Sequence, residues 1–464
     1  MKIAILGATG FIGRALVLAL QGRGDELRVL TRTSDAEATR AAIDDADAVI
    51  NLAGESIAGK RWTAARKRAL HASRIGTTQR LVDAIATRRV PLPVLICASA
   101  TGWYGDRGGI ELDDRSRPGE GFAADLCVAW EEVAREAAAA RIVHARFGVV
   151  LGREGGALDA LLPIFRLGLG GPIGGGAQWM PWIHLEDAVR AIVQMLDDPR
   201  LVGPVAVVAP PVHQRDFARA LGRALGRPAV IPVPAAGVRL VLGEAASILL
   251  ASQRVIPRAL AAAGFAHRFP TIEAALADIV DDGVTIERSG ALPDDAYVRE
   301  RRPRYTLRAR TELDAPLADV FAFFSSPENL AALTPRGLAF EITTKRPIAM
   351  TTGTLIDYRI RVAGIPMRWQ TRIERWGDGV SFVDSQLRGP YRAWWHEHRF
   401  TASPNGGTIM EDVVHYAPPL GPLGAIANLM FVERMLRRIF GYRRQAIRIR
   451  FGAKPGELSA RARA

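Results

Sequence analysis

The chain has 464 residues and a formal net charge of +13 at pH 7, and 48% of its residues are hydrophobic. One hydrophobic core stops growing at about 250 to 300 residues, so the length predicts two domains. No apolar run reaches the ~18 residues of a transmembrane helix without charge, and Met1 is followed by the strand-like KIAIL rather than a signal peptide. Cys97 and Cys127 lack metal-ligand spacing and suit a reducing compartment, so we predict a cytoplasmic protein.

The positive charge does not by itself predict a nucleic-acid partner. Much of the excess falls late in the chain, in RERRPRY within residues 298–305, in ERMLRRIFGYRRQAIRIR at 433–450 and in the basic tail at 454–464. These segments are not interleaved with stacking aromatic residues. We therefore do not expect nucleic-acid binding.

Residues 1 to about 200 alternate short apolar runs, such as KIAILGA and AVINLAG, with helical patterns. This alternation predicts an α/β fold of the doubly wound Rossmann type, a parallel sheet covered by helices on both faces. From 228 to 283 the pattern becomes helical and predicts a small cap, so the first domain spans 1–283. Residues 284–304 mix charge with Gly and Pro without sustained periodicity, which predicts a linker.

The motif GATGFIG places Gly7, Gly10 and Gly13 directly after the first strand and at the opening of a helix. Glycines there let the backbone turn tightly and approach a pyrophosphate, which the helix N-terminus stabilises. The alternative is a tight turn with a structural role only. We predict a dinucleotide site that also includes the other residues of the motif, Thr9, Phe11 and Ile12.

The second strand, LRVLT, ends in Arg32. A site for NAD would hold Asp or Glu there to bind the ribose 2′-hydroxyl, whereas Arg can pair with a 2′-phosphate. The sequence therefore favours NADP(H) over NAD(H), the alternative being an ordinary surface arginine.

Several segments carry a resemblance to a known family. GATGFIG, NLAG at 51–54, CASATGWYG at 97–105 and PWIHLEDA at 181–188 resemble the epimerase and dehydratase branch of the extended short-chain dehydrogenase/reductase superfamily. SRIGTTQ, RFGVVLGREGGAL and VPAAGVRLVLGE are similar to an atypical group of epimerase-family proteins with a small C-terminal helical extension, over residues 1 to about 280. The resemblance implies that the NADP site is also lined by Thr31, Arg32, Leu52, Ala53, Gly54 and Arg74. For Arg74 the alternative is a solvated helix face.

The expected catalytic pair of this superfamily is missing. Most members use a Tyr as general acid or base and a Lys four residues later that lowers the pKa of the Tyr. Lys is absent between Lys67 and Lys345, and either Ala123 and Cys127 or Asp125 and Ala129 occupy the expected place.

The remaining candidates for catalysis are Ser99 and Tyr104. Tyr104 is the tyrosine expected near a nicotinamide, and Ser99 either orients a carbonyl or satisfies a strand-end backbone group.

A glycine-rich stretch, LGLGGPIGGGAQ at 167–178, leads into WMPWIHLEDA. Gln178, Trp179 and Trp182 are candidates for substrate binding, and the glycine-rich loop is a candidate lid. His184 lies in an apolar stretch and is expected to be a hydrogen-bonded structural residue.

The second domain is predicted at 305–453. Its strand-like, aromatic-rich segments, an early helix at PLADVFAFFSS and a long basic amphipathic helix at about 424–449 resemble the START-like helix-grip superfamily, an α+β fold. That resemblance implies an antiparallel sheet that wraps the last helix around a cavity for an apolar ligand. His396, His398 and Asp412 are too weak a pattern to predict a metal, so we expect a hydrogen-bonded cluster and no metal site.

The leading hypothesis is an NADP(H)-dependent oxidoreductase or epimerase acting on an unidentified carbonyl or sugar-like small molecule, joined to a domain that binds an apolar ligand. The rival is a non-catalytic NADP(H) sensor that regulates the ligand-binding domain, which the missing Tyr and Lys favour. A third possibility is membrane-surface contact through the basic helix at 433–450, whose apolar face is instead expected to pack on its own sheet.

Overall fold

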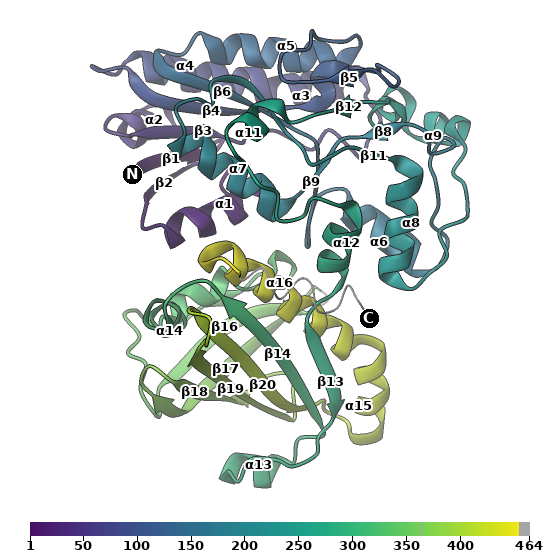
Figure 1. The fold of residues 1–464 in the computed structure, drawn as a ribbon. Coiled ribbons are helices and arrows are strands. Elements are labelled where there is room, and N and C mark those ends of the chain that lie inside the picture. Colours follow the sequence, from purple (N-terminus) through teal and green to yellow (C-terminus); the bar gives the residue numbers. More distant parts are fainter. Residues whose placement is uncertain (363, 454–464) are drawn as a thin grey trace. The chain divides into compact units, whose positions relative to one another are not determined.

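The computed structural model of the protein describes residues 1–362 and 364–453 (Figure 1). The chain divides into two compact units, Met1–Val280 and Asp281–Ala464. The basic tail predicted at 454–464 lies outside the described residues.

The first unit is built on a six-stranded parallel sheet in the order β10-β6-β4-β3-β1-β2. All five strand pairs are parallel. Its strands are β1 (Lys2–Leu6), β2 (Glu26–Leu30), β3 (Ala48–Asn51), β4 (Leu92–Ala100), β6 (Ala139–Phe147) and β10 (Gly203–Val207). The chain leaves β1 for β2 on one side and returns to β3 on the other, and open α/β sheets bind ligands at such a switch point.

Helices cover both faces of this sheet. They are α1 (Phe11–Gly22), α2 (Ala36–Ile43), α3 (Ala64–His71), α4 (Thr77–Ala86), α5 (Phe122–Arg135) and α7 (Leu185–Asp197). Helix α1 contacts α7, whereas α4 contacts α2 and α5, and Figure 1 draws the two groups on opposite faces. The predicted α/β sheet is therefore present.

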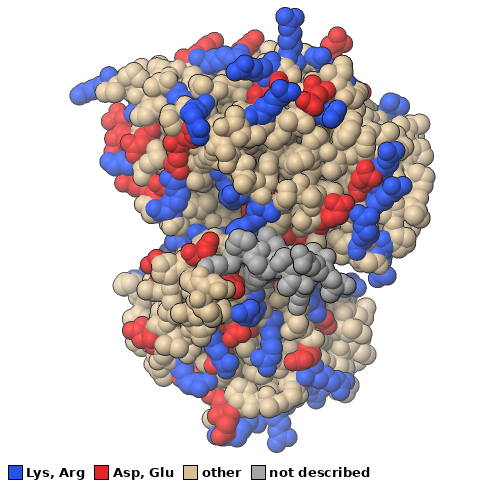
Figure 2. Space-filling view, in the orientation of Figure 1, with Lys and Arg blue, Asp and Glu red and all other residues tan. Residues whose placement is uncertain are grey.

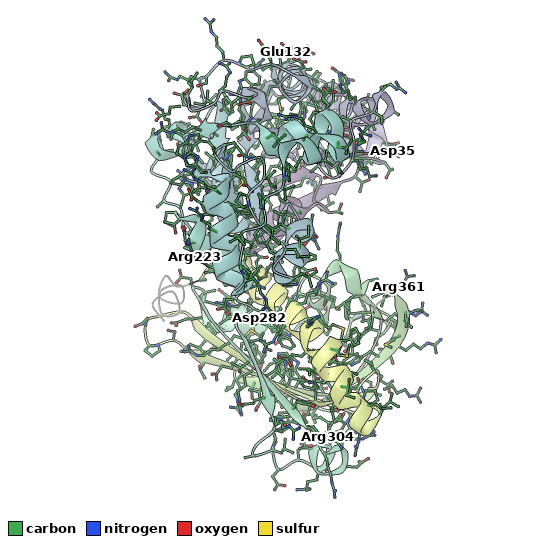
Figure 3. The ribbon with its side chains drawn as sticks, turned by 90° about the vertical axis from the view of Figure 1, so that its right-hand side faces the viewer. Asp35, Glu132, Arg223, Asp282, Arg304 and Arg361 are labelled. Atoms are coloured by element: carbon green, nitrogen blue, oxygen red, sulfur yellow. The ribbon has the colours of Figure 1, made fainter. Side chains whose placement is uncertain are left out.

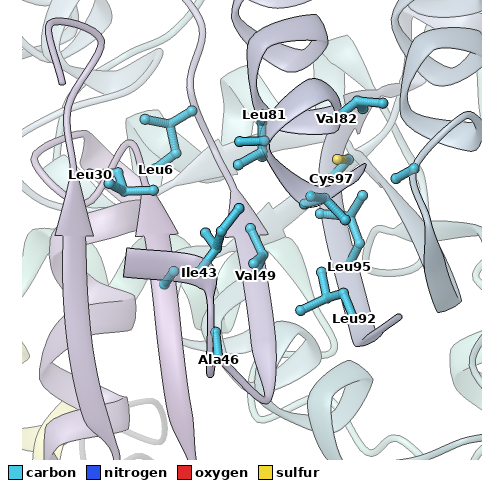
Figure 4. Packing of buried hydrophobic residues seen from close by; sticks show 14 of the residues in the cluster. Leu6, Leu30, Ile43, Ala46, Val49, Leu81, Val82, Leu92, Leu95 and Cys97 are labelled. Carbon is cyan, nitrogen blue, oxygen red and sulfur yellow. The ribbon is translucent and has the colours of Figure 1, made fainter. Parts of the chain in front are cut away.

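The apolar runs of the strands pack beneath these helices. Ala4, Val49 and Leu95 of the sheet share one buried cluster with Ile43 of α2 and Ile85 of α4 (Figure 4). The strands of a parallel sheet are buried on both faces, which is why their sequences are continuously apolar rather than alternating.

Short elements complete the first unit. Three small two-stranded sheets pair β7 (Val149–Leu151) with β9 (Trp182–His184), β8 (Trp179–Met180) with β11 (Val212–His213), and β5 (Glu111–Leu112) with β12 (Arg254–Val255). The other helices are η1 (Ala72–Gly76), η2 (Thr101–Tyr104), α6 (Leu158–Arg166), α8 (Gln214–Leu225), α9 (Ala235–Leu242), η3 (Gly243–Ala246), α10 (Ser247–Leu250), α11 (Arg258–Ala262) and α12 (Ile272–Val280). The predicted cap region is thus largely helical, from α9 to α12.

The second unit is an antiparallel sheet of eight strands in the order β13-β14-β20-β19-β18-β17-β16-β15. The strands are β13 (Val284–Arg288), β14 (Tyr305–Leu313), β15 (Glu341–Ile342), β16 (Leu355–Val362), β17 (Ile365–Gly377), β18 (Ser381–Arg388), β19 (Ala393–Ala402) and β20 (Thr408–Ala417). Its helices are α13 (Ala296–Arg301), α14 (Leu317–Phe324), η4 (Pro327–Ala331), η5 (Arg336–Leu338), α15 (Gly421–Ala427), η6 (Asn428–Val432) and α16 (Glu433–Phe451).

Helix α16 packs its apolar side on this sheet. Leu436 and Phe440 are buried in one cluster with Trp369 of β17, Trp394 of β19 and Val414 of β20. The apolar face of the basic helix therefore packs on the sheet of its own domain, as expected from its amphipathic pattern.

The predicted linker differs from the structure. Val284–Arg288 forms β13, which pairs with β14 as an edge strand of the second unit, and Ala296–Arg301 forms α13. Tyr297 of α13 is buried and donates a hydrogen bond from its hydroxyl to the Gln386 carbonyl oxygen, at 3.0 Å. The segment has no repeating pattern because it consists of two short elements, each stabilised by residues distant in sequence.

Acidic and basic side chains are interspersed on the face drawn in Figure 2. Among the described residues, no helix is both long and apolar enough to cross a membrane.

Candidate functional site

The glycine-rich loop after β1 is packed against the backbone that follows β3. Gly7 has φ of +91°, and a Cβ placed there would lie 2.7 Å from the Leu52 carbonyl carbon. A Cβ on Gly13 would collide with the Gly7 carbonyl oxygen. The close approach of the loop after β3 thus requires glycine at position 7, and the packing of α1 against its own preceding loop requires glycine at position 13.

The N-terminus of α1 opens beside this loop. Gly10 is its N-cap and provides no side-chain hydrogen bond, and the first turn contains no acidic residue. The first amide groups of a helix lack partners inside the helix, and the helix dipole favours negative charge there. The arrangement fits the pyrophosphate of a dinucleotide. Thr9 is exposed in the loop, and the half-buried Phe11 packs against glycines 152, 155 and 156.

Hydroxyl groups and one guanidinium gather at the end of β2. The Thr31 hydroxyl oxygen lies 3.0 Å from that of Thr33 and 3.2 Å from that of Ser34. The Arg32 side chain is 57% exposed, and its Nη1 lies 3.7 Å from Oε1 of Glu55. Glu55 also forms an ion pair with Arg66, so its charge is already compensated. These donors suit a 2′-phosphate better than a bare 2′-hydroxyl.

Arg74 supports the loop after β3. It lies in the π-helical turn η1, is half-buried, and donates from Nη2 to the Glu55 carbonyl oxygen at 2.9 Å. A Cβ on Gly54 would lie 3.3 Å from its Cζ, and burial lowers its pKa. The alternative of a solvated helix face is therefore wrong, because Arg74 turns inward to hold the backbone that carries Leu52, Ala53 and Gly54.

Of the two pairs that could occupy the place of the missing Tyr and Lys, Ala123 and Cys127 face the turn after β4. Both lie on α5 and face Gly102, where a Cβ would be 3.4 Å from the Ala123 Cβ and 3.5 Å from the Cys127 Sγ. Asp125 is exposed on another side of the helix, which separates the two candidate pairs. Burial raises the pKa of Cys127 to about 11, so its thiol keeps its proton at neutral pH.

Behind this position lies a buried network of polar side chains. Arg146 of β6 pairs with Glu131 of α5 through two contacts of 2.8 and 2.9 Å, and Ser99 donates from its hydroxyl to Glu131 at 2.7 Å. Arg146 also lies 3.8 Å from the ring centroid of Trp103. Ser99, Glu131 and Arg146 are each at most 3% exposed. The partner of Ser99 is thus a carboxylate rather than the strand-end backbone group considered above.

Tyr104 reaches the same network from η2. Its hydroxyl accepts a 3.5 Å hydrogen bond from Arg146 Nη1, and the residue is fully buried. Burial outweighs Arg146 and raises the pKa of Tyr104 to about 12. The phenol therefore stays protonated at neutral pH.

Sequence reasoning missed Glu131 and Arg146. The available signal is weak: Arg146 is a charge inside the apolar strand IVHARFGVV, and Glu131 follows Trp130 in an amphipathic helix. Their pairing spans two elements, so neither residue predicts the other.

The predicted substrate residues separate in the structure. Trp182 is fully buried and donates from Nε1 to the Pro210 carbonyl oxygen at 3.0 Å, which makes it a core residue and not a pocket residue. The Gln178 side-chain amide donates to the Ile173 and Leu249 carbonyl oxygens. Trp179 is half-buried, and its ring centroid lies 3.9 Å from that of His213. His184 is buried as the N-cap of α7, its Nδ1 accepting from the Glu186 amide, in agreement with the structural role expected for it.

The second unit contains a cavity of about 200 Å³ between the sheet and α16. Aromatic and aliphatic side chains form most of its wall, among them Phe324, Leu333, Tyr358, Trp369, Trp394 and Phe440. The polar residues Asp384, His396, His398 and Arg443 also line it.

Strand register brings these polar residues together. His396 pairs across the sheet with Asp384, and His398 pairs with Asp412. Residues two apart on a strand share a face, so both histidines and both carboxylates point to the same side. Asp384 was not among the residues singled out from the sequence.

The charged and titratable groups of the cluster shift the pKa values of their neighbours. Burial and the neighbouring His398 lower the pKa of His396 to about 4. Burial acts to raise the pKa of Asp412, but Arg443 and the hydrogen bonds with the two histidines hold it well below its usual range. The predicted hydrogen-bonded cluster is present, and His396 contacts Asp412 at 2.9 Å.

The first unit is similar in sequence to known families and proteins. The NAD dependent epimerase/dehydratase family matches residues 3–209, and a domain of unknown function, DUF1731, matches residues 233–279. Epimerase family protein SDR39U1 of Bos taurus is 40% identical over 293 residues, which cover 60% of this chain and 100% of that protein. Epimerase family protein Mb2239 of Mycobacterium bovis is 41% identical over 290 residues, covering 59% and 96% of the two chains.

A solved structure agrees with the sequence relatives. The crystal structure of human epimerase family protein SDR39U1 (isoform 2) with NADPH is 38% identical, has a TM-score of 0.57, and covers 60% of this chain and 99% of that one. The two family matches, at 3–209 and 233–279, include the glycine-rich loop, the switch point and most of the helical cap. Through its first unit, the chain belongs to the NAD dependent epimerase/dehydratase family.

Proposed function

We propose that the first unit binds NADP(H) and acts as an oxidoreductase or epimerase on a carbonyl or sugar-like small molecule. The observation that carries this proposal is the end of β2, where the exposed Arg32 stands beside the hydroxyls of Thr31, Thr33 and Ser34. The presence of NADPH in the crystal structure of the human relative supports the same nucleotide here.

Different residues of this chain would bind different parts of NADP(H). The glycine-rich loop and the α1 N-terminus would hold the pyrophosphate, Thr31 and Arg32 the 2′-phosphate, and the loop at 52–54, supported by Arg74, one side of the nucleotide. When bound, NADP(H) supplies or accepts a hydride.

Ser99 and Tyr104 are the residues that would donate a proton or a hydrogen bond to the substrate in this proposal. A phenol with a pKa of about 12 is protonated at neutral pH, so Tyr104 would donate a proton or a hydrogen bond rather than act as a base. Glu131 and Arg146 would fix the orientation of both hydroxyls.

A second candidate function is a non-catalytic NADP(H) sensor. The observation that favours it is the replacement of the acid–base pair by Ala123 and Cys127, whose side chains cannot exchange protons at neutral pH. Burial of Ser99 and Tyr104 in a satisfied network points the same way.

For the second unit we propose a helix-grip domain that binds an apolar ligand. The antiparallel sheet, the long helix α16 packed on it and the cavity between them support this assignment. Its volume of about 200 Å³ exceeds the ~150 Å³ of an engineered protein cavity that binds benzene.

Fluorescence titration of the full-length protein with NADPH and NADH tests the cofactor. Arg32→Glu should weaken NADPH binding about 10- to 100-fold, because a charge-assisted hydrogen bond contributes about 1.5 to 3 kcal/mol, and should leave NADH binding nearly unchanged. Arg40→Glu makes the same charge change on the exposed surface of α2 and serves as the control. Equal losses for both nucleotides would contradict the assignment of the 2′-phosphate to Arg32.

Turnover separates the two candidate functions. With NADPH bound, a panel of carbonyl compounds and nucleotide sugars is added while the fluorescence of the reduced cofactor is followed. Oxidation by any member supports the enzyme, and Ser99→Ala and Tyr104→Phe then test the proton donors. Epimerisation consumes no cofactor overall, so the nucleotide sugars are also incubated with the NADP⁺-bound protein and their stereochemistry is followed by NMR. Tight binding with neither cofactor oxidation nor epimerisation supports the sensor.

A further inference from the structure

The polar end of the cavity in the second unit has the composition of a metal site. Asp384, His396 and His398 each offer one ligand atom, and these three atoms lie within 4.8 Å of one another. All three residues line the cavity, whereas Asp412 does not. Two imidazoles and one carboxylate are a ligand set that divalent transition metals accept in proteins.

Two of the three distances between the ligand atoms are close to those around a tetrahedral ion. Zinc binds His nitrogen and carboxylate oxygen at about 2.0 to 2.2 Å, which places neighbouring ligand atoms roughly 3.3 Å apart. In the structure, Asp384 Oδ2 lies 3.6 Å from His396 Nδ1 and 3.1 Å from His398 Nε2. The two nitrogens lie within 4.8 Å of each other, and the side chains would draw together around the ion to complete the geometry.

Asp412 sets the direction of the His396 ring nitrogens. It lies 2.9 Å from His396 Nε2 and 3.1 Å from His398 Nδ1. When Asp412 accepts N–H from His396 Nε2, the lone pair of His396 Nδ1 faces Asp384. Arg443 Nη2 donates to His398 Nδ1, so His398 Nε2 carries the proton that lies against Asp384, and a bound metal ion would displace that proton. A carboxylate behind metal-binding histidines is the usual means of orienting them.

Charge within the cluster favours a cation. Arg443 Nη2 lies 3.1 Å from Asp412 Oδ1 and 3.1 Å from His398 Nδ1, and it compensates one of the two carboxylates. Asp384 lies against the two imidazoles alone among the cavity-lining polar groups described above, and a cation between them would balance its charge in a largely apolar cavity.

We propose that Asp384, His396 and His398 bind a divalent transition-metal ion such as Zn²⁺, with Asp412 as the residue that positions His396. Three protein ligands leave the fourth coordination position facing the cavity, as in zinc sites that bind water or a further ligand. This site is independent of the nucleotide site, so either can exist without the other.

Metal binding to the full-length protein tests the proposal directly. After treatment with EDTA, the protein is dialysed against Zn²⁺, and bound metal is measured by mass spectrometry. We expect about one equivalent per chain. Co²⁺ in place of Zn²⁺ should give the intense visible absorption of a four- or five-coordinate site. Metal bound at less than a tenth of an equivalent, or a weak octahedral Co²⁺ spectrum, would overturn the proposal.

Variants locate the ion. His398→Ala and Asp384→Ala should each abolish binding of the equivalent, and Asp412→Asn should weaken it about 10- to 100-fold through loss of orientation. His415→Ala is the matched control, since His415 is also a buried histidine but hydrogen-bonds to Thr306 and does not line the cavity. Undiminished binding by a His396→Ala/His398→Ala double variant would assign the metal to another site and reject the proposal.

X-ray absorption of the Zn²⁺-loaded wild-type protein tests the ligand set without any variant, so the result does not depend on whether the variants fold. The proposed site predicts two imidazole ligands and oxygen ligands at about 2.0 Å. A spectrum without imidazole scattering would contradict it even if every variant failed to fold.

Discussion

Glu131 and Arg146 form a deeply buried charge pair in the first unit, at 1% and 2% exposure. Two parallel contacts and the hydroxyl of Ser99 satisfy the carboxylate, while the guanidinium also contacts the Asp114 carbonyl oxygen at 3.1 Å. A buried pair of this kind is sensitive to loss of one partner, because the remaining charge stays out of water.

We expect Glu131→Gln to lower the free energy of unfolding by about 3 to 5 kcal/mol, since it leaves Arg146 buried without a counter-charge. Chemical denaturation of the two proteins measures the difference. Glu132→Gln is the matched control: Glu132 is the next residue along α5 and is exposed on the surface of the unit (Figure 3). A similar loss from both variants would mean that helix propensity, and not the buried pair, is responsible.

A second single residue, His144, makes the stability of the first unit depend on pH. It is 2% exposed in β6, and burial lowers its pKa to about 4, below the ordinary 6.5. Between these values the unfolded chain binds a proton that the folded chain does not, so stability is complete above pH 6.5 and falls as the pH drops toward 4.

At pH values below about 4, the lowered pKa of His144 reduces the free energy of unfolding by roughly 3 kcal/mol relative to pH 7, because each unit of difference between the folded and unfolded pKa values corresponds to about 1.36 kcal/mol. His144→Gln should therefore flatten the stability profile between pH 4 and 6.5, as measured by denaturation at several pH values. His71→Gln, an exposed position at the end of α3, should leave the profile unchanged. If the wild type and His144→Gln show the same slope, His144 titrates normally in the folded state.

At the scale of elements, α16 and the segment before it bury their apolar side chains differently. Leu436 of α16 is 1% exposed, whereas Leu429 of η6 is 74% exposed, and Leu423 and Phe431 are exposed as well. The burial of α16 explains its amphipathic pattern, while the large apolar side chains described between 420 and 431, such as Ile426 and Met430, are exposed in the second unit.

Leu436→Ala should lower the free energy of unfolding of the second unit by about 2 to 5 kcal/mol, the usual range for a cavity left in a packed core. Leu429→Ala should change it by no more than about 0.5 kcal/mol. Thermal and chemical denaturation of both variants check the contrast. Equal effects would show that α16 does not depend on its contacts with the sheet.

Helix α5 keeps its packing on the sheet although it lacks the acid–base pair expected on it. Its apolar stripe packs on the sheet, and the positions that face Gly102 hold Ala123 and Cys127 instead of an acid and a base. Packing constrains the size and polarity of these side chains, so the fold tolerates the replacement.

At the scale of the whole molecule, each of the two units has its own apolar core. We therefore expect two transitions in calorimetry of the full-length protein. NADPH at about 100 times its Kd should stabilise the transition of the first unit by about 2.7 kcal/mol and leave the second in place. A single transition that moves as a whole on NADPH addition would instead show that the units unfold together.

The sequence was sufficient for the features that depend on local pattern. Alternating strands and helices predicted the parallel sheet, and GATGFIG predicted the loop in which Gly7 and Gly13 leave no room for a side chain. The resemblance to the epimerase family agreed with the family found for the first unit.

The tertiary structure alone decided which residues meet. Trp182 was assigned to a pocket and lies in the core, β13 was hidden in an apparent linker, and Asp384 joined His396 and His398 through strand register. Each of these depends on pairing between segments far apart in the chain. A sequence carries the periodicity and backbone preferences of each segment, because these are local. The neighbours that give a buried charge or a histidine its function are fixed only when the sheet and its helices assemble.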